Sequence, residues 1–246
     1  MGRYDYDDAI AITRDIFWVG FNDEAADLRC NPYLLVEDGE AILFDPGSIP
    51  DFPTVMRKVV ELVDPSIIST IVIHHQDPDV CGNLAVVEDL VERDDLRVVA
   101  HSGTIRLIRH LGISSHLYAV DDHDNQLVLD CGRKLEFMRT PYLHAPGAMV
   151  TFDPTTRTLF SSDIFGANST EWDLFARAGY AAHMREWHEA MMPSGSILSW
   201  ALKAIRKRWD IGRIAPQHGS ILEGDAVTEA FELLENTPCG VDLLMR

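Results

Sequence analysis

The run Thr70–His74 ("TIVIH") restricts the fold of this chain more than any other stretch. It is β-branched and lacks the alternation of polar and apolar residues of a half-exposed strand, so it predicts a strand covered on both faces. A helical pattern over 53–63 precedes it, with Pro53 suited to a first turn, and another over 83–92 follows it. A buried strand between two helices is typical of an α/β fold.

Short apolar runs between turn signals continue along the chain and predict further strands, while later 3.6-residue patterns predict helices. The expected strands cover 16–20, 33–38, 41–45, 97–100, 127–129, 134–138, 148–152, 158–162 and 213–216, and the remaining expected helices cover 102–111, 183–191, 196–208 and 225–234. Strands in both halves with helices beside them predict an α/β fold of the αββα type, in which two mixed sheets pack face to face beneath outer helices. No linker-like stretch divides the chain, so we expect one domain over 1–246.

The net charge of the chain limits the classes of partner that it can bind. With 21 basic and 39 acidic residues the formal charge is −18, and such a surface repels phosphates, so we expect no nucleic-acid partner. The concentrated basic run Lys203–Trp209 has helical spacing and is interpreted as the solvated face of a helix. No apolar segment approaches the roughly 20 residues that cross a bilayer, and the acidic N-terminus lacks a signal-peptide core. We therefore expect a soluble, cytoplasmic protein without membrane contact.

The spacing of the four cysteines does not indicate a disulfide framework or a zinc site. Cys30, Cys81, Cys131 and Cys239 are widely separated and form no CxxC pair, so we expect reduced thiols rather than disulfides or a zinc ribbon. Cys81 lies close to the candidate site described next, and it is interpreted as a small, buried packing residue.

Metal-ligating side chains follow the central strand directly. His75, Asp77 and Asp79 occupy alternate positions, which in an extended segment would place them on one side. Pro78 favours this geometry, because it biases the preceding residue toward extended backbone. His74 then points to the opposite side, where we expect it to pack or to hydrogen-bond behind the ligands.

Three later residues lie just beyond strand-like runs in the same way: His144, Asp163 and His218. Loops at strand ends are where α/β folds carry their chemistry, so these residues complete a candidate set of three imidazoles and three carboxylates. A core or surface role is commoner than ligation for an isolated histidine, and six stay unassigned for that reason. They are His101, His110, His116, His123, His183 and His188.

This order of residues resembles the metallo-β-lactamase superfamily, whose motif His-x-His/Glu/Asp-x-Asp-His is followed by a distant His, a bridging Asp and a last His. The resemblance covers essentially the whole chain, from "YLLVEDGEAILFDPG", with Asp45 at the usual early aspartate, to "PQHG". "HQDPD" and "CNPYLLV" are most similar to the flavodiiron branch, in which the second ligand is a carboxylate. The resemblance implies a first metal held by His75, Asp77 and His144, a second held by Asp79 and His218, and Asp163 bridging both.

Imidazoles mixed with hard carboxylates suit iron, so we expect two iron ions, with zinc or manganese as alternatives. Val80 stands where the superfamily has a histidine, which leaves the second metal one ligand short. The flavodoxin domain of flavodiiron reductases has no counterpart in this sequence, and we expect no bound flavin.

The resemblance, with these departures, implies a di-iron protein that binds dioxygen at the open position, as a sensor or carrier with a signalling partner. Two other functions stay open: a binuclear hydrolase of thioesters, lactones or phosphoesters, and an O2 or NO reductase core supplied by a separate electron-transfer protein. The oligomeric state is open as well. Aromatic residues after the bridging aspartate are expected in the core, a lid over the metals being the alternative: Phe165, Trp172, Phe175 and Tyr180.

Overall fold

The computed structural model describes residues 4–168 and 173–245. Within them, the first sheet has the strand order β1 (Ile10–Ala11), β2 (Ile16–Trp18), β5 (Tyr33–Glu37), β6 (Glu40–Phe44), β7 (Ile68–Val72), β8 (Arg97–Ala100) and β9 (His116–Ala119). The second sheet has the order β10 (Gln126–Val128), β11 (Lys134–Arg139), β12 (Met149–Asp153), β13 (Thr158–Phe160), β14 (Arg213–Ala215) and β15 (Leu222–Glu223). A separate ribbon pairs β3 (Phe21–Asp23) with β4 (Leu28–Cys30).

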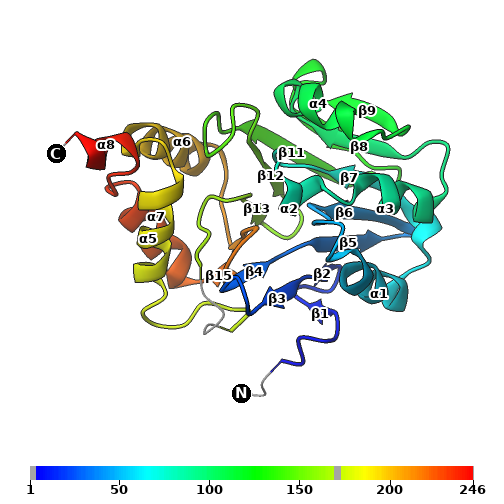
Figure 1. Cartoon of the computed structure of the whole chain (residues 1–246), viewed down its shortest axis with the longest axis horizontal. Helices are drawn as coiled ribbons and strands as arrows, with labels where there is room; N and C mark the ends of the chain where they lie inside the picture. Colours follow the sequence, from blue (N-terminus) through cyan, green and yellow to red (C-terminus); the bar gives the residue numbers. More distant parts are fainter. Residues whose placement is uncertain (1–3, 169–172, 246) are drawn as a thin grey trace.

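Helices cover both outer faces, as Figure 1 shows. Beside the first sheet lie α1 (Phe52–Leu62), α3 (Leu84–Val91) and α4 (Ser102–Ile108), and beside the second lie α5 (Ala181–Met191), α6 (Gly195–Arg208) and α7 (Asp225–Leu234). Shorter elements are α2 (Pro78–Cys81), α8 (Val241–Leu244), η1 (Pro65–Ile67), η2 (Arg109–Leu111) and η3 (Val120–Asp122). The expected α/β fold, an αββα sandwich, is therefore confirmed.

The central strand β7 explains this arrangement. All five of its residues are buried, as the unbroken β-branched run predicted, and it pairs in parallel with both β6 and β8. Parallel neighbours need a crossover, which α1 and α3 supply on the outer face. The turn at Asp38 and Gly39, both with positive φ, closes the antiparallel β5–β6 hairpin.

The core fills the space between the sheets. The rings of Phe44 from β6 and Phe160 from β13 stack with their centroids 4.0 Å apart and so join one sheet to the other. A second buried cluster lies between the second sheet and helices α5 to α7, where Phe165 packs against Phe231. None of the helices formed by the described residues has the length and apolar character needed to cross a bilayer.

Candidate metal centre

Both sheets deliver candidate ligands to one end of the sandwich. His75 follows β7, His144 lies in the loop between β11 and β12, and Asp163 follows β13. His218 follows β14, which runs parallel to β13, so the chain leaves these two strands at the same edge of the second sheet. The strand-end placement that the sequence predicted is therefore observed for all four residues.

The segment after His75 corrects one prediction. Asp77 has extended backbone (φ −73°, ψ 151°), as expected before a proline, but Pro78 then opens the short helix α2, which contains Asp79. The continuous extended stretch expected over 75–79 is therefore wrong. Proline suits the first position of a helix as well as an extended segment, because its fixed φ is common to both. Asp79 reaches the site from a helical turn instead.

The first group of candidate ligands is compact. Single ligand atoms from His75, Asp77 and His144 all lie within 4.8 Å of one another. The Nε2 atom of His144 is 3.3 Å from Asp77 Oδ2, and that of His75 is 3.8 Å from the same oxygen. Two imidazoles and one carboxylate thus converge as the resemblance implied.

A second group lies on the other side of Asp163. His218 Nε2 is 3.1 Å from Asp79 Oδ2 and 3.8 Å from Asp163 Oδ1. The other carboxylate oxygen of Asp163, Oδ2, is 2.8 Å from His144 Nε2 and faces the first group. The two oxygens of Asp163 therefore point to different histidines, which is the geometry that a bridging carboxylate requires.

The charged groups of this cluster shift one another's pKa values. Burial would raise the pKa of the Asp163 carboxyl, but the charge of His75, the hydrogen bond from His144 and the charge of His218 lower the pKa well below its usual range. The hydrogen bond to Asp163 raises the pKa of His144, and burial opposes that rise only in part. An anionic Asp163 at the centre of the cluster follows.

The pair of His218 and Asp79 behaves in the same way. Burial would lower the pKa of His218, yet its hydrogen bond to Asp79 and the nearby charge of Asp163 raise that pKa well above its usual value. Burial would raise the pKa of Asp79, but the same hydrogen bond lowers it. Both groups are polarised by each other, as expected where a cation could replace the shared proton.

These residues fit a pair of metal ions. Asp163 is only 1% exposed, and within the described residues its Oδ1 atom has no hydrogen-bond partner. A buried carboxylate oxygen without a partner is costly, and a metal ion would satisfy it. His75 and His218 are equally buried, whereas the side chains of His144, Asp77 and Asp79 are 22%, 31% and 38% exposed. The cluster therefore opens to solvent on the side of these last three residues.

Hydrogen bonds at their Nδ1 atoms orient two of the candidate histidines. The Nδ1–H of His218 donates to the carbonyl oxygen of Arg29 at 3.2 Å, and the Nδ1 of His75 hydrogen-bonds to the Ser162 hydroxyl at 3.1 Å. In both rings the Nε2 atom is thus turned toward the site, an arrangement usual for metal-binding histidines. Sequence reasoning missed both contacts. Only the position of Ser162 beside Asp163 could have suggested one of them.

Trp187 is a further residue that the sequence did not single out. Its indole N–H donates to the carbonyl oxygen of Asp163 at 3.2 Å, and its ring centroid is 5.1 Å from that of His218. It reaches the site from α5, more than twenty residues along the chain from Asp163, so no local pattern marks it. Trp187 therefore links α5 to the backbone of Asp163 and to the ring of His218.

His74 takes the supporting role expected of it. Its Nδ1 is 2.5 Å from Asp45 Oδ2, and its Nε2 is 2.9 Å from the Thr151 hydroxyl. Both ring nitrogens therefore bind groups other than the candidate metal ligands. Asp45 also accepts the backbone N–H of His74, which ties the end of β6 to the end of β7.

Cys81 is 1% exposed, and its thiol donates to the carbonyl oxygen of Asp77. Burial, with the charges of three nearby aspartates, raises its pKa to about 12, so the packing role predicted for it agrees with the structure.

Phe165 and Tyr180 are buried in the second cluster, and Phe175 packs against the first, so these three belong to the core rather than to a lid. Trp172 lies outside the described residues.

Val80 is fully buried and belongs to the apolar cluster between the sheets. It follows Asp79 within α2, and its backbone carbonyl accepts the N–H of Gly47. A valine side chain offers no ligand atom. The position where the superfamily has a histidine is thus occupied by a packed aliphatic group.

The family follows from a comparison with known proteins. A family model described as "ODP family beta lactamase" matches residues 28–219, a range that includes all six candidate ligands. The chain belongs to this family. An uncharacterised protein of Methanocaldococcus jannaschii is 29% identical to this ODP-family chain over 232 residues, which are 86% of the chain and 56% of the relative. A nitric oxide reductase of Moorella thermoacetica is 26% identical over 243 residues, 90% of the chain and 60% of the reductase. The ODP-family chain thus spans little more than half of either relative.

Solved structures agree with this assignment. A peroxy diiron species of the chemotaxis sensor ODP is 25% identical, with a TM-score of 0.81 over 96% of the ODP-family chain and 98% of the sensor. The apo state of the sensor from T. denticola gives the same identity and TM-score. The flavodiiron protein from Giardia intestinalis, 20% identical, shares the fold with a TM-score of 0.84 over 96% of this chain and 60% of its own. The resemblance to the flavodiiron-like branch of the metallo-β-lactamase superfamily is confirmed.

Proposed function

We propose that this chain is a non-haem di-iron protein that binds dioxygen and acts as an oxygen sensor. The observation that carries the proposal is the position of Asp163, which directs one carboxylate oxygen to His144 and the other toward His218. The similarity along almost the whole chain to a chemotaxis sensor with a diiron species supports the choice of metal and of ligand.

The ligand assignment is part of the proposal. The first iron would be held by His75, Asp77 and His144, and the second by Asp79 and His218, with Asp163 shared by both. When bound, two ferrous ions supply coordination positions for dioxygen and the electrons that its binding requires. Three aspartates offset only three of the four metal charges, so the site retains a net positive charge that favours an anionic oxygen ligand.

The candidate site has a buried side and a solvent-facing side. His75 and Asp163 form the buried floor, and Trp187 holds the backbone of Asp163 in place. The partly exposed Asp77 and Asp79 lie at the solvent side. Val80 contributes no ligand atom, so Asp79, His218 and the shared Asp163 are the residues of this chain that would hold the second metal.

A reductase core fed by a separate electron-transfer protein is the second candidate. It is favoured by the similarity to a nitric oxide reductase over 90% of this chain. The two candidates share the same metal centre and differ in the partner, which is a signalling protein for a sensor and an electron donor for a reductase. Turnover therefore separates them.

The experiment starts with metal analysis of the purified chain and of its anaerobically iron-loaded, reduced form. The optical spectrum is recorded before and after addition of dioxygen, with Asp163→Asn as the matched variant. We expect about two iron ions per chain, a new charge-transfer band on aeration, and neither in the variant. A chain that holds only zinc at full occupancy, or an unchanged spectrum with iron bound, would overturn the proposal. Continuous oxygen or nitric oxide consumption with reduced rubredoxin would favour the reductase.

A further inference from the structure

The backbone carbonyl of Asp79 lies near the end of the short helix α2. If the helix continued, the N–H of Asn83 would donate to this carbonyl, which lies four residues before it. That N–H donates instead to the carbonyl oxygen of Gly47 at 3.0 Å, and α2 ends at Cys81. The last carbonyls of a helix take their hydrogen bonds from other parts of the fold, so the Asp79 carbonyl is open to another donor.

Gln217 supplies that donor from the second sheet. Its side-chain amide nitrogen, Nε2, donates to the Asp79 carbonyl oxygen at 3.2 Å, although 138 positions separate the two residues along the chain. Gln217 directly precedes His218 in the loop after β14. One hydrogen bond therefore joins the two segments that carry Asp79 and His218, the residues that would hold the second metal together with Asp163.

The backbone of Gln217 is fixed on both sides. Its N–H donates at 2.8 Å to the carbonyl oxygen of Ser162, the residue before Asp163, and its own carbonyl accepts the N–H of Asn31 at 2.9 Å. The side-chain amide of Asn31 donates two further hydrogen bonds to the same loop, to the carbonyl oxygens of Pro216 and Gly219. Because this backbone is held, the Gln217 side chain can hold α2 in turn.

The burial of the Gln217 side chain is unfavourable in part. The residue is only 1% exposed, and its amide oxygen Oε1 has no hydrogen-bond partner among residues 4–168 and 173–245. A buried polar atom without a partner destabilises the folded chain. An apolar side chain of similar size would fill the same space without this penalty, so packing alone does not account for a glutamine here.

We propose that Gln217 is a positioning residue for the second metal: its amide holds α2 against the loop after β14, so that Asp79 and His218 face the same ion. This inference deepens the proposed function and rests on its assignment of two metals. His218 Nε2 is 3.1 Å from Asp79 Oδ2, so the two ligands are already close together. Since Val80 offers no ligand atom, the second ion depends on few residues of the chain, and the alignment of each has a large effect on its affinity.

The first metal should not depend on this hydrogen bond. Its proposed ligands contact one another directly, with Asp77 Oδ2 3.3 Å from His144 Nε2 and 3.8 Å from His75 Nε2. Asp77 precedes α2 and accepts a separate hydrogen bond from the side-chain amide of Gln76. Loss of the Gln217 bond should therefore weaken one metal and spare the other, which a general effect on folding would not do.

The test is anaerobic equilibrium dialysis of the metal-free chain against ferrous iron over a range of concentrations. We expect wild type to take up both ions. Gln217→Met has a side chain of similar size without a donor, so its second ion should bind roughly tenfold or more weakly, with the first within about twofold of wild type. The urea midpoint of the metal-free variant should change little, because removal of an unpaired buried oxygen offsets the lost hydrogen bond.

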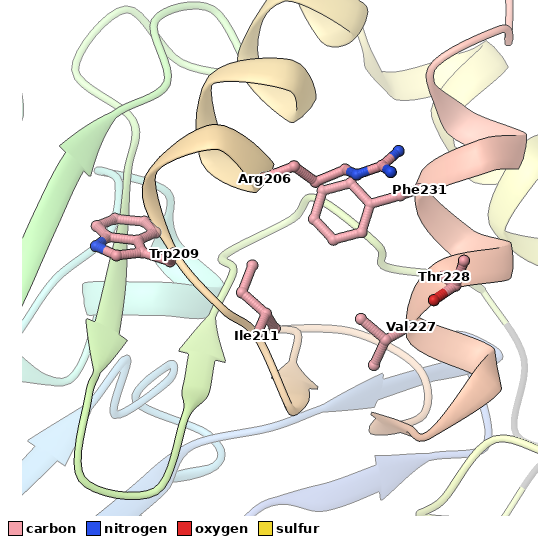
Figure 2. A pocket seen from close by; sticks show the side chains of 6 residues that line it. All are labelled: Arg206, Trp209, Ile211, Val227, Thr228 and Phe231. Atoms are coloured by element: carbon pink, nitrogen blue, oxygen red, sulfur yellow. The ribbon is translucent and has the colours of Figure 1, made fainter.

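A second variant and two controls accompany Gln217→Met. Gln217→Asn keeps the amide but shortens the side chain by one methylene, so its nitrogen no longer reaches the Asp79 carbonyl and its second ion should also bind more weakly. Gln126→Met makes the same chemical change in the edge strand β10. Thr228→Val removes a hydroxyl from the groove between the end of α6 and α7, and Figure 2 shows that no candidate ligand lines this groove. Both controls should bind both ions as wild type does.

The outcomes separate this inference from the proposed function. If wild type and both Gln217 variants take up the two ions with the same affinities, Gln217 does not position the second metal, and the di-iron proposal stands. Equal weakening of both ions together with a lower urea midpoint would show a general structural role and would also overturn the inference. If wild type itself does not take up both ions at saturating iron, the di-iron assignment fails, and the inference fails with it.

Discussion

His144 Nε2 lies 2.8 Å from Asp163 Oδ2, although the two residues come from different loops of the second sheet. The same carboxylate turns its other oxygen toward His218, 3.8 Å away. Asp163 is therefore the common neighbour of both halves of the cluster. Because Asp163 is buried, water does not solvate its negative charge. Histidines or metal ions must therefore compensate that charge.

Asp163→Asn should abolish binding of both metals. An amide is a poor bridging ligand and removes the negative charge that both ions share. We expect iron per chain to fall from about two to well below one after desalting, as measured by inductively coupled plasma spectrometry. Asp122→Asn, on the exposed turn η3, is the control and should retain wild-type metal content. Retention of two ions by the Asp163 variant would exclude the bridging role.

Val80→His should have opposite effects on the metal-free and iron-loaded chains. Val80 is fully buried among apolar side chains, so an unpaired imidazole there should lower the free energy of unfolding of the metal-free chain by about 1–3 kcal/mol. If the new ring reaches the second iron, ferrous iron should restore the loss through binding linkage and weaken the optical response to dioxygen. Urea unfolding with and without iron measures the first effect. A loss that iron does not restore would show that position 80 is not the open coordination site.

His188 should make the metal-free chain sensitive to mild acid. Its ring is fully buried between the Phe165 N–H, which it accepts, and the Met184 carbonyl, to which it donates. Burial lowers its pKa from 6.5 to about 4. Between these values the unfolded chain binds a proton that the folded chain does not, so the free energy of unfolding falls as the pH falls.

The expected loss between pH 7 and pH 5 is about 2 kcal/mol from this group alone. His188→Gln removes the titration and should show a correspondingly smaller loss over the same range, although it is less stable at pH 7. His110→Gln, on the exposed turn η2, is the control and should follow wild type. Equal acid sensitivity of wild type and the His188 variant in urea unfolding would contradict the assignment.

Arg133→Met should destabilise the fold strongly, although Arg133 pairs with none of the candidate metal ligands. Arg133 pairs with Asp15 and Glu37 of the first-sheet side and with Asp153 of β12, which is fully buried. Removal of the cation leaves the buried Asp153 carboxylate without a counter-ion, so we expect the free energy of unfolding to fall by about 3–5 kcal/mol.

The control for Arg133 is Arg57→Met, which breaks an exposed pair with Glu61 and should cost less than about 1 kcal/mol. Chemical denaturation of both variants gives the comparison. A cost for Arg133→Met as small as that of the control would show that this network contributes little to joining the sheets.

The sequence indicated which residues gather at the candidate site. The buried run before His75, and strand-like runs before Asp163 and His218, were visible because a β-branched segment without alternation has few alternatives to a central strand. The six candidate residues are close together in the structure, and their role as metal ligands stays a prediction. The one local error concerned Asp79, since Pro78 is compatible with both an extended segment and a first helical turn.

Short edge elements escaped the sequence analysis for a different reason. The strands β1, β3, β4, β9 and β15 contain only two to four residues each, too few to show a period of two above background. Their pairing is decided by the neighbouring strand. The isolated bridge between Cys30 and His218, which places β4 beside a candidate ligand, is a contact of this kind.

The sequence by itself determined the layered α/β fold and the types of side chain at the strand ends, because periodicity and residue chemistry are local properties. Only the tertiary structure decided that Asp163 stands between His144 and His218 and that Trp187 reaches the backbone of Asp163 from α5. These relations join residues far apart along the chain. They depend on how two sheets and their helices pack, which no short window of sequence contains.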